Sequence, residues 1–310
     1  MGSDEPVISV VIPHLNQPEN LRACLASLEA QRGDGVPFEV IVVDNGSPEP
    51  PAAVCADFGG VRLEVETTPG PGPARSHGAG LARGGILAFI DSDCTADPGW
   101  FSAIAAYFRR KDAADALGGQ VRIAPVNPED LTMVEAFESV YGYRMKLFIE
   151  RDNYAATCNM AVRREVFEKV GPFAGINVAE DMDWGQRATA MGYRIEYVPE
   201  IGIHTPAREN FADLTRKWDR HIAHDFEVVP AGIVPRLKWL LRAAALAASP
   251  LAEIPTIART GYLSGFGDRL LCLRGVVRIR WYRAWKMLQL AFGADGSRMS
   301  GGWHQTGGRG

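Results

Sequence analysis

The sequence predicts an α/β fold in which helices flank a mostly parallel sheet. Short apolar runs rich in β-branched residues alternate with segments of helical periodicity between residues 7 and 90, which is the pattern of βαβ units. Three of these runs end in polar or acidic residues, and open α/β sheets bind ligands at the carboxyl ends of their strands. Beyond residue 230 the chain is expected to form helices only.

In the first part of the chain, hydrophobic periodicity and turn residues define each expected element. Leu21, Cys24, Leu25 and Leu28 recur at helical spacing, and Gly33 follows as a stop signal. A turn sequence, Asn-Gly-Ser, follows the second apolar run. Strands are expected at residues 7–12, 38–43, 61–66 and 85–90, and helices at 21–28, 52–58 and 74–83.

The second part of the chain is less regular. A single long helix is expected over residues 131–149, and Gly192 is placed to end a helix that begins at residue 180. The remaining helices are expected at 98–110, 211–226, 235–247, 255–262 and 268–292, with a further short helix that ends at residue 170. Strands are expected at 121–123 and 193–198, and residues 157–162 are expected to form a loop or a strand.

Charge is distributed unevenly along the 310 residues. Residues 230–310 contain 12 Lys and Arg against 3 Asp and Glu, whereas the preceding residues contain 21 against 34. Opposite charge balances suggest parts with different roles. We therefore expect a catalytic domain at residues 6–229, a basic helical extension at 230–293, and a disordered Gly- and Ser-rich tail at 294–310.

The five cysteines are scattered and have neither disulfide-like nor zinc-like spacing, which indicates a reducing compartment. The first apolar run is short, so no signal peptide is expected. The longest helical apolar stretch, residues 239–254, is interrupted by charged residues and a proline, so no bilayer span is expected.

The tripeptide Asp91-Ser92-Asp93 comes directly after the buried apolar run at 85–90. Ionised carboxylates are costly to desolvate unless a cation or hydrogen-bond donors offset the cost. In an extended conformation both carboxylates would face one side, so we expect them to bind a hard divalent cation that also holds phosphate oxygens. The alternative is an Asp-rich turn before the helix after Pro98, for which Asp97 would already serve as the cap.

Two further strand ends carry polar residues, and together with Asp91 they would outline a pocket. Pro13 and His14 end the first strand, and Asp44 ends the second. For Asp44 the alternative role is that of a turn residue, and for His14 it is that of an ordinary surface histidine.

Five segments of the chain form a recognisable series: ISVVIPHLNQPENLRACLASL, FEVIVVDNGSPE, GPARSHGAGLARGGILAFIDSDC, TCNMAVRREVFEKVGPF and AEDMDWGQRATAMGYRIEYVPEIGIHT. Together they resemble the family 2 glycosyltransferases of the GT-A fold, in the family's order and over roughly residues 6–225. This resemblance implies an α/β GT-A fold: a Rossmann-like mixed sheet flanked by helices, with a C-terminal α-helical extension.

The resemblance also implies a donor site for a nucleoside-diphosphate sugar. Asp44 would hydrogen-bond the nucleobase, and Arg75 would lie near the phosphates or the base. The family's Arg-Asn-x-Gly has Ser76 in place of Asn, which leaves no side-chain amide there, and a solvated helix arginine is the alternative for Arg75. The same pocket would be lined by Pro13, His14, Asn16, Asp91 and Ser92.

A divalent metal, Mn²⁺ or Mg²⁺, is implied as the cofactor. Asp93 would bind it directly, and Asp91 would bind the ribose or a metal-bound water. His204 lies at a spacing at which several family members have a metal-binding histidine, and imidazole suits manganese better than magnesium. An exposed or core histidine is the alternative.

On the acceptor side, the resemblance implies that Asp181 is the general base, and Glu180 or Asp183 is the alternative candidate for this role. Acids in the first turn of a helix also favour the helix dipole, which is the alternative role for each. Trp184 and Trp100 could stack on an acceptor sugar, although core packing is the commoner role of tryptophan. Asn159 and Thr157 could hydrogen-bond donor or acceptor hydroxyls, and a polar pair at a strand edge is their alternative role.

The function that the resemblance implies is inverting, metal-dependent sugar transfer from a nucleoside-diphosphate sugar, with a UDP-sugar as the leading donor, to a glycan or glycolipid of the cell surface. A sugar-phosphate nucleotidyltransferase is an alternative, but such enzymes carry a Gly-rich basic loop after the first strand, and this chain has Pro-His-Leu-Asn-Gln there. A non-catalytic binder of sugar nucleotides would have no need of Asp181. The chain lacks the glycine motifs of dinucleotide oxidoreductases and P-loop enzymes.

The helix expected at 268–292 is basic and aromatic. Leu270, Leu273, Val277, Trp281 and Trp285 would share one face, which could lie at an anionic membrane surface with arginines beside it. The alternative is a helix packed on the acidic catalytic domain. Nucleic acid is not an expected partner, because the rest of the chain is acidic. We expect a cytoplasmic protein, peripheral at the inner face of the membrane, and the oligomeric state stays open.

Overall fold

The computed structural model describes residues 6–292 apart from 177, 209, 228 and 231, so the tail predicted at 294–310 lies outside the described residues. The chain forms two units, each continuous in space but not in sequence. The first, which we call the sheet unit, comprises Met1–Arg122 and Arg144–Thr205. The second, which we call the helical unit, comprises Ile123–Tyr143 and Pro206–Gly310.

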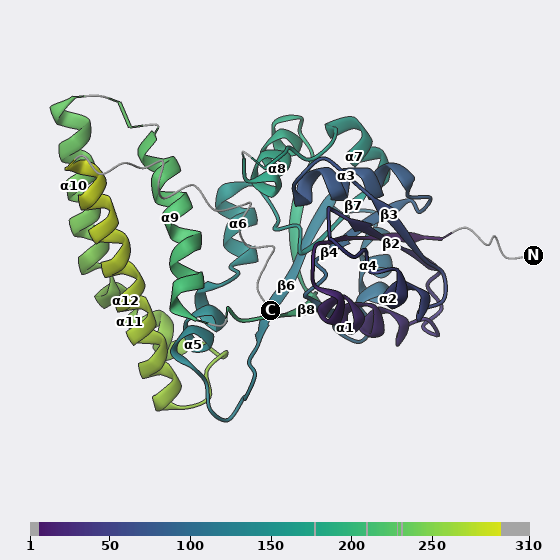
Figure 1. The fold of residues 1–310 in the computed structure, drawn as a ribbon, viewed down its shortest axis with the longest axis horizontal. Helices are drawn as coiled ribbons and strands as arrows, with labels where there is room; N and C mark the ends of the chain where they lie inside the picture. The colour runs from purple at the N-terminus through teal and green to yellow at the C-terminus, as the bar shows by residue number, and fades with distance from the viewer. Residues whose placement is uncertain (1–5, 177, 209, 228, 231, 293–310) are drawn as a thin grey trace, which may run out of the picture. The chain divides into compact units, whose positions relative to one another are not determined.

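Within the described residues, one mixed sheet of eight strands has the order β3-β2-β1-β4-β7-β6-β8-β5 (Figure 1). Strands β1 to β4 pair in parallel, as predicted, whereas β7 pairs antiparallel to both β4 and β6, and β5 pairs antiparallel to β8. The strands are β1 (Ile8–His14), β2 (Phe38–Asp44), β3 (Val61–Val65), β4 (Ile86–Ile90), β5 (Thr95–Ala96), β6 (Ala116–Ala124), β7 (Asn159–Arg163) and β8 (Ile195–Pro206).

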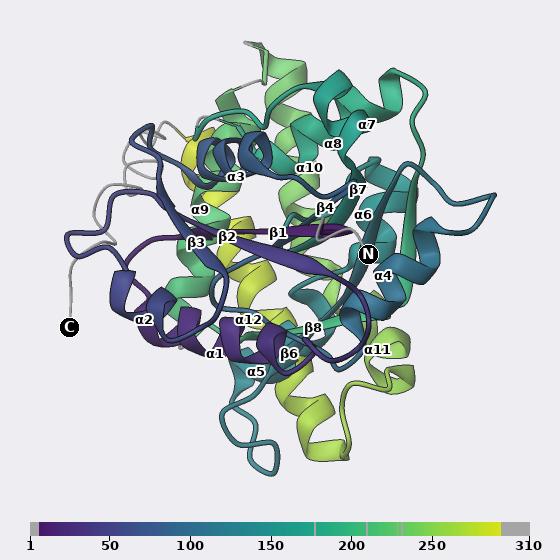
Figure 2. The same ribbon diagram turned by 90° about the vertical axis from the view of Figure 1, so that its right-hand side faces the viewer.

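Helices cover both faces of the sheet. Figure 2 shows α3 on one face and α1 with α2 on the other, which buries β1 and β2 between two layers. A strand that is covered on both faces has an almost continuous apolar sequence, which explains why apolar runs in the sequence were enough to locate β1 and β2. The helices of the sheet unit are α1 (Pro18–Glu29), α2 (Ala52–Ala56), α3 (Pro71–Leu81), α4 (Trp100–Phe108), α6 (Met145–Asp152), α7 (Arg164–Val170) and α8 (Glu180–Ala190).

The helical unit is built around its last helix. Cys272, Val276 and Ile279 are buried in a core shared with Phe137 and Leu214 from the other helices. The unit contains α5 (Met133–Tyr141), α9 (Phe211–Glu227), α10 (Ile233–Ala248), α11 (Pro250–Arg259) and α12 (Phe266–Ala291). Helices α5 and α9 therefore belong to the helical unit, although both lie within residues 6–229, which were expected to form the catalytic domain. The boundary between the two units differs from the predicted boundary at residue 229.

The single helix expected over residues 131–149 is two helices. Thr132 and Glu135 form a capping box that starts α5, and Gly142 ends it before α6 begins at Met145. The boundary between the units falls at Tyr143, so the two halves of the expected helix pack in different cores.

No described helix is, by itself, long and apolar enough to cross a bilayer. Helices α10 and α11 meet the length and hydropathy criteria only as a pair, with a 41° bend between them.

Helix α3 lies so close to the sheet that one of its glycines has no room for a side chain. A Cβ atom at Gly78 would be 2.5 Å from a methyl group of Val11 and 3.0 Å from one of Val43. Gly80, two residues later on the same helix, faces open space. At the start of α3, the N–H of the N-cap Gly70 donates to Oδ1 of Asn45, the residue that follows β2, at 2.7 Å.

We expect Gly78→Ala to lower the free energy of unfolding by about 1–3 kcal/mol, because the new methyl group overpacks the contact with the sheet. Gly80→Ala is the matched control in the same helix, and it should raise stability by up to about 1 kcal/mol because alanine restricts the unfolded chain. Urea unfolding of both variants measures the difference. Equal effects of the two substitutions would contradict the close packing.

Candidate active site

The acidic turn after β4 lies at the carboxyl edge of the sheet. Asp91 and Asp93 are partly exposed, and Ser92 between them is buried. The backbone is not extended as predicted: the Cys94 N–H donates to the Asp91 carbonyl at 3.0 Å, which closes a turn. The Ser92 hydroxyl is 3.4 Å from Oε1 of Gln17, so the turn is joined to the loop after β1.

Arg75 is a buried residue at this edge of the sheet, and it contacts two of the acidic residues there. It lies in the first turns of α3 and is 3% exposed. Its Nη2 donates to Oδ1 of Asp91 at 2.6 Å, and its Nη1 donates to Oε1 of Glu180 at 2.8 Å. One guanidinium therefore bridges the turn after β4 and the first turn of α8. This arrangement contradicts the alternative of a solvated helix arginine.

The electrostatics around Arg75 explain why it stays charged. Burial alone would lower the pKa of the guanidinium, but the nearby carboxylates of Asp91 and Glu180 outweigh burial and raise it. A buried ion pair is favourable only where its partners are well placed, and two short charge-assisted hydrogen bonds meet that condition.

Asp181 lies beside this bridge, at the start of α8. Burial, followed by repulsion from Glu180, raises the pKa of Asp181 to about 6, although Arg75 and a hydrogen bond from the Met182 N–H partly oppose this. A carboxylate with a pKa nearer neutrality is a stronger base than an ordinary aspartate. Asp183, the reserve candidate, is held in an i,i+4 ion pair with Arg187 at 2.9 Å.

The ends of β1 and β2 form a second polar cluster, because His14 and Asp44 are opposite each other in the strand register. His14 Nε2 accepts from the Gln17 N–H at 3.2 Å, so Nδ1 carries the proton that is donated to Asp44 at 2.9 Å. Asp44 is 1% exposed and also accepts from the Ser47 hydroxyl and N–H and from the Gly46 N–H.

In this structure the Asp44 carboxylate therefore organises the loop after β2, which is the turn-forming role raised for it. Its direct bond to a nucleobase stays a prediction, and it would require one of these internal hydrogen bonds to give way. Pro13 is partly exposed next to this cluster. Asn16 is exposed with a φ of 56°, and its N–H donates to the Ser47 hydroxyl at 2.9 Å.

Asn45 follows Asp44 at the polar end of β2, and no role of its own was predicted for it. Its Nδ2 donates to the carbonyls of Glu66 and Thr68, and its Oδ1 accepts from the Gly70 N–H at 2.7 Å. These bonds hold the loop that leads into α3 and so set the place of Arg75. The available signal was the position of Asn45 directly after an acidic strand end.

Ser76, which replaces the family's asparagine, also has a structural partner. Its hydroxyl accepts from the Phe173 N–H at 2.9 Å, and Phe173 is buried. This bond joins α3 to the segment between α7 and α8.

His204 lies on β8, where it pairs in register with Thr95, two residues after Asp93. Its Nδ1 is 3.0 Å from Oδ1 of Asp97, whose Oδ2 accepts from Arg122 at 2.6 Å. Asp97 was expected to cap α4, but the N-cap of α4 is Gly99, and the Asp97 carboxylate is paired with His204 and Arg122 instead. A histidine whose one nitrogen is held by a carboxylate presents its other nitrogen in a fixed direction, as metal-binding histidines do.

The described residues contain no group of three or more His, Cys, Asp or Glu side chains placed to hold a metal ion. The pairing of β5 with β8 nevertheless brings Asp93 and His204 to the same part of the sheet. One carboxylate and one imidazole fit a cation whose remaining ligands are phosphate oxygens and water. Asp91 is less suited as a ligand, because Oδ1 is already paired with Arg75.

The four candidate acceptor residues need correction. Trp184 and Trp100 are 0% and 1% exposed, and their ring nitrogens donate to the Gly171 carbonyl and to Asn159 respectively. Asn159 is also bonded through Nδ2 to two backbone carbonyls, and Thr157 is buried. These side chains form the core beneath the site, and neither indole presents a face on which a sugar could stack.

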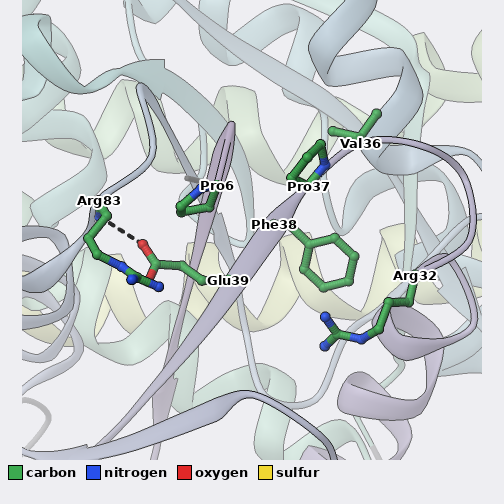
Figure 3. Close-up of a pocket in the computed structure, with 7 residues that line it drawn as sticks. All are labelled: Pro6, Arg32, Val36, Pro37, Phe38, Glu39 and Arg83. Atoms are coloured by element: carbon green, nitrogen blue, oxygen red, sulfur yellow. Dashed lines mark hydrogen bonds and ion pairs between the residues drawn. The ribbon is translucent and has the colours of Figure 1, made fainter. Parts of the chain in front are cut away.

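A cavity of about 220 Å³ lies at the opposite end of the sheet from this site, where β1 and β2 begin (Figure 3). Arg83 there pairs with the buried Glu39 at 2.9 Å, and Arg32 lies over the Phe38 ring. No residue of the acidic edge lines it, so it is separate from the candidate active site.

Comparison with known proteins agrees with the fold. The model of the family described as glycosyl transferase family 2 matches residues 9–171. The chain belongs to glycosyl transferase family 2. Within this family, it is 34% identical to glycosyltransferase AglE of Haloferax volcanii over 71% of this chain and 73% of that protein.

Solved structures share the GT-A fold of this family 2 glycosyltransferase. The mannosyltransferase PcManGT from Pyrobaculum calidifontis, in complex with GDP-Man and Mn²⁺, aligns with a TM-score of 0.57 and 17% identity over 97% of this chain and 88% of that chain. TarS residues 1–349 from S. aureus, in complex with UDP-GlcNAc, aligns with a TM-score of 0.50 and 18% identity over 92% of each chain.

The raised pKa of Asp181 predicts a pH-dependent stability change in Asp181→Asn. Ionised Asp181 destabilises the folded state, and this penalty appears as pH rises from the unfolded pKa near 4 through the folded pKa of about 6. The neutral variant should therefore unfold at a higher temperature than the wild type at pH 7.5, and the gain should vanish near pH 4. Thermal unfolding across this range tests the sign, and a variant that is less stable at pH 7.5 would contradict it.

Proposed function

We propose that this family 2 glycosyltransferase transfers a sugar from a nucleoside-diphosphate sugar to a hydroxyl group of a glycan or glycolipid acceptor, with inversion at the anomeric carbon. The observation that carries the proposal is the bridge from Asp91 through Arg75 to Glu180. It joins the acidic turn expected to face the donor to the helix that carries the candidate base. Donor and acceptor chemistry could then meet at one edge of the sheet.

Asp181 is the proposed general base. The acceptor oxygen attacks the anomeric carbon from the side opposite the diphosphate, and Asp181 takes the hydroxyl proton as the new bond forms. The bond from the anomeric carbon to the diphosphate oxygen breaks, and its electron pair leaves with the nucleoside diphosphate. A pKa of about 6 suits this role, because the carboxylate is ionised at neutral pH yet remains a competent proton acceptor.

Asp93 and His204 are the residues proposed to hold Mn²⁺ or Mg²⁺. When bound, the ion would neutralise charge on the departing diphosphate. Asp97 holds Nδ1 of His204, and Arg122 holds Asp97, so the imidazole is oriented before any ion arrives. His14, Asn16 and the loop held by Asp44 are proposed to line the nucleotide site.

A UDP-sugar remains the first donor to test. The solved relatives bind GDP-Man in one case and UDP-GlcNAc in the other, so a GDP-sugar belongs in the same screen. The proposed location is the cytoplasmic face of the membrane, where a glycolipid or surface-glycan acceptor would be found.

The test of this function is the release of nucleoside diphosphate from a panel of nucleotide sugars with Mn²⁺ and lipid-linked or glycan acceptors. We expect turnover with one donor class, and Asp181→Asn should reduce kcat by at least about 10²-fold, as loss of a general base does. Asp183→Asn is the matched control on the same helix, and its kcat should stay near that of the wild type. Turnover that survives in Asp181→Asn but is lost in Asp183→Asn would assign the base to Asp183 instead.

The orienting role proposed for Asp97 predicts weaker metal binding in Asp97→Asn. Loss of a carboxylate that holds a metal-binding histidine typically reduces metal affinity by roughly 10- to 100-fold. Electron paramagnetic resonance titration of Mn²⁺, with saturating UDP or GDP present, measures this without turnover. Asp112→Asn, which removes a carboxylate from an exposed pair with Arg110, is the control. Equal affinity in both variants would remove Asp97 from the proposal.

A further inference from the structure

The outward face of α10 is apolar where a surface helix normally carries charge. Val234, Leu237 and Leu241 are 63%, 54% and 62% exposed, and their spacing of three and four places them on one side of the helix. The opposite side is the packed one: Trp239 and Ala243 are buried in the core of the helical unit. Helix α10 is therefore apolar on both faces, and only one of them has a partner in the described structure.

The exposed apolar surface continues into the next helix. Ala244, Ala245 and Ala248 are exposed on the same side of α10, and Leu251 and Ile254 are 75% and 46% exposed on α11. We call Val234, Leu237, Leu241 and these alanines the α10 stripe. One face of α10 is buried against its own protein, and α10 by itself does not meet the length and hydropathy criteria for a span. A surface of this kind can lie in the plane of a bilayer with one face inserted.

Helix α10 carries basic residues and no acidic residue. From residue 230 to residue 252 the sequence contains no Asp or Glu, whereas Arg236 and Lys238 are exposed on α10. Arg242 is also exposed and is paired with Asp225 at 3.1 Å. Cations beside an inserted apolar face are complementary to anionic lipid headgroups.

A tryptophan from α12 lies at the end of the stripe. Trp281 is 61% exposed, and its indole N–H donates to the Ala247 carbonyl in the last turn of α10 at 3.1 Å. Trp285, one turn later, is 59% exposed. Tryptophan is favoured at membrane interfaces because its ring is apolar and its N–H is polar.

The basic residues of α12 were predicted to lie at an anionic membrane surface. Several of them instead contact other residues of the helical unit. Arg280 pairs with Glu253 at 2.5 Å, Arg278 lies over the Phe211 ring, and Arg283 lies over the Trp218 ring. Much of the positive charge of α12 therefore stabilises the bundle. This shifts the membrane-facing role from the basic face of α12 toward α10.

We propose that the α10 stripe is the surface by which this glycosyltransferase docks on an anionic membrane, with α10 parallel to the bilayer plane and Leu237 and Leu241 inserted below the headgroups. The inference rests on the peripheral location in the proposed function, and it names the surface responsible. A second copy of the chain is the less favourable occupant, since α10 carries three basic residues and no acidic residue, so two such helices in contact would repel each other.

The test is flotation of the full-length protein with phosphatidylcholine vesicles that contain or lack phosphatidylglycerol. The wild type should float with the anionic vesicles, and less at high salt. Leu237→Glu and Leu241→Glu should each lower vesicle affinity by roughly tenfold or more, because a leucine leaves the apolar phase and an acid enters it. Both positions are exposed, and thermal unfolding confirms that each variant is folded.

Two controls separate this surface from others of equal exposure. Leu270→Glu, on the exposed face of α12, and Met191→Glu, in the sheet unit, replace leucine and methionine side chains that are 56% and 53% exposed. Both should float like the wild type. A loss confined to Leu270→Glu would overturn the proposal in favour of α12, and no binding of the wild type at low salt would overturn it altogether.

Two further outcomes are distinguishable. If the stripe seats a second copy, the wild type without lipid will sediment as a dimer, Leu241→Glu will sediment as a monomer, and the proposal fails. Transfer to a water-soluble acceptor should be unchanged in Leu237→Glu, because this residue is outside the active site. A protein that floats through α10 but transfers no sugar would therefore refute the proposed function and leave the docking surface supported.

Discussion

The buried guanidinium of Arg75 is the interaction on which the candidate site depends. It is held between Asp91 and Glu180, two carboxylates that belong to different elements of the sheet unit. Without this cation, the acidic turn after β4 and the acidic first turn of α8 would repel each other across a poorly solvated space. Removing one member of a buried ion pair generally costs more than the pair contributes, because the remaining charge is left uncompensated. The geometry of the whole edge is therefore coupled to one side chain.

The same arrangement of charges affects the pKa of Asp181. Arg75 neutralises part of the local negative charge but does not contact Asp181 in a described hydrogen bond, so burial and Glu180 still raise the pKa of Asp181 to about 6. Ionised Asp181 destabilises the folded state, and the same ionised carboxylate is the proposed general base. Sites that are poised for chemistry are often locally destabilising, and the close packing of α3 on the sheet at Gly78 is one of the contacts that can offset the cost.

The helical unit accounts for the uneven charge of the chain in a way that composition could not. Arg278 and Arg283 lie over aromatic rings, and Arg280 pairs with Glu253, so these cations stabilise the packing of α12. The apolar surface that remains without a partner is on α10, although α12 has the more conspicuous pattern of basic and aromatic residues. Which face of an amphipathic helix is covered depends on its neighbours, and periodicity does not identify them.

The sequence by itself determined the parallel strands β1 to β4, the polar residues at their ends and the family, because these follow from local periodicity and short motifs. It failed where the partner of a residue is distant. The expected helix at 131–149 is divided because its halves pack in different cores, and Trp100 and Trp184 are buried by contacts that no local pattern encodes. Only the tertiary structure decided that Arg75 joins two segments 105 residues apart and that Asp97 holds His204, since ion pairs form between side chains that folding brings together.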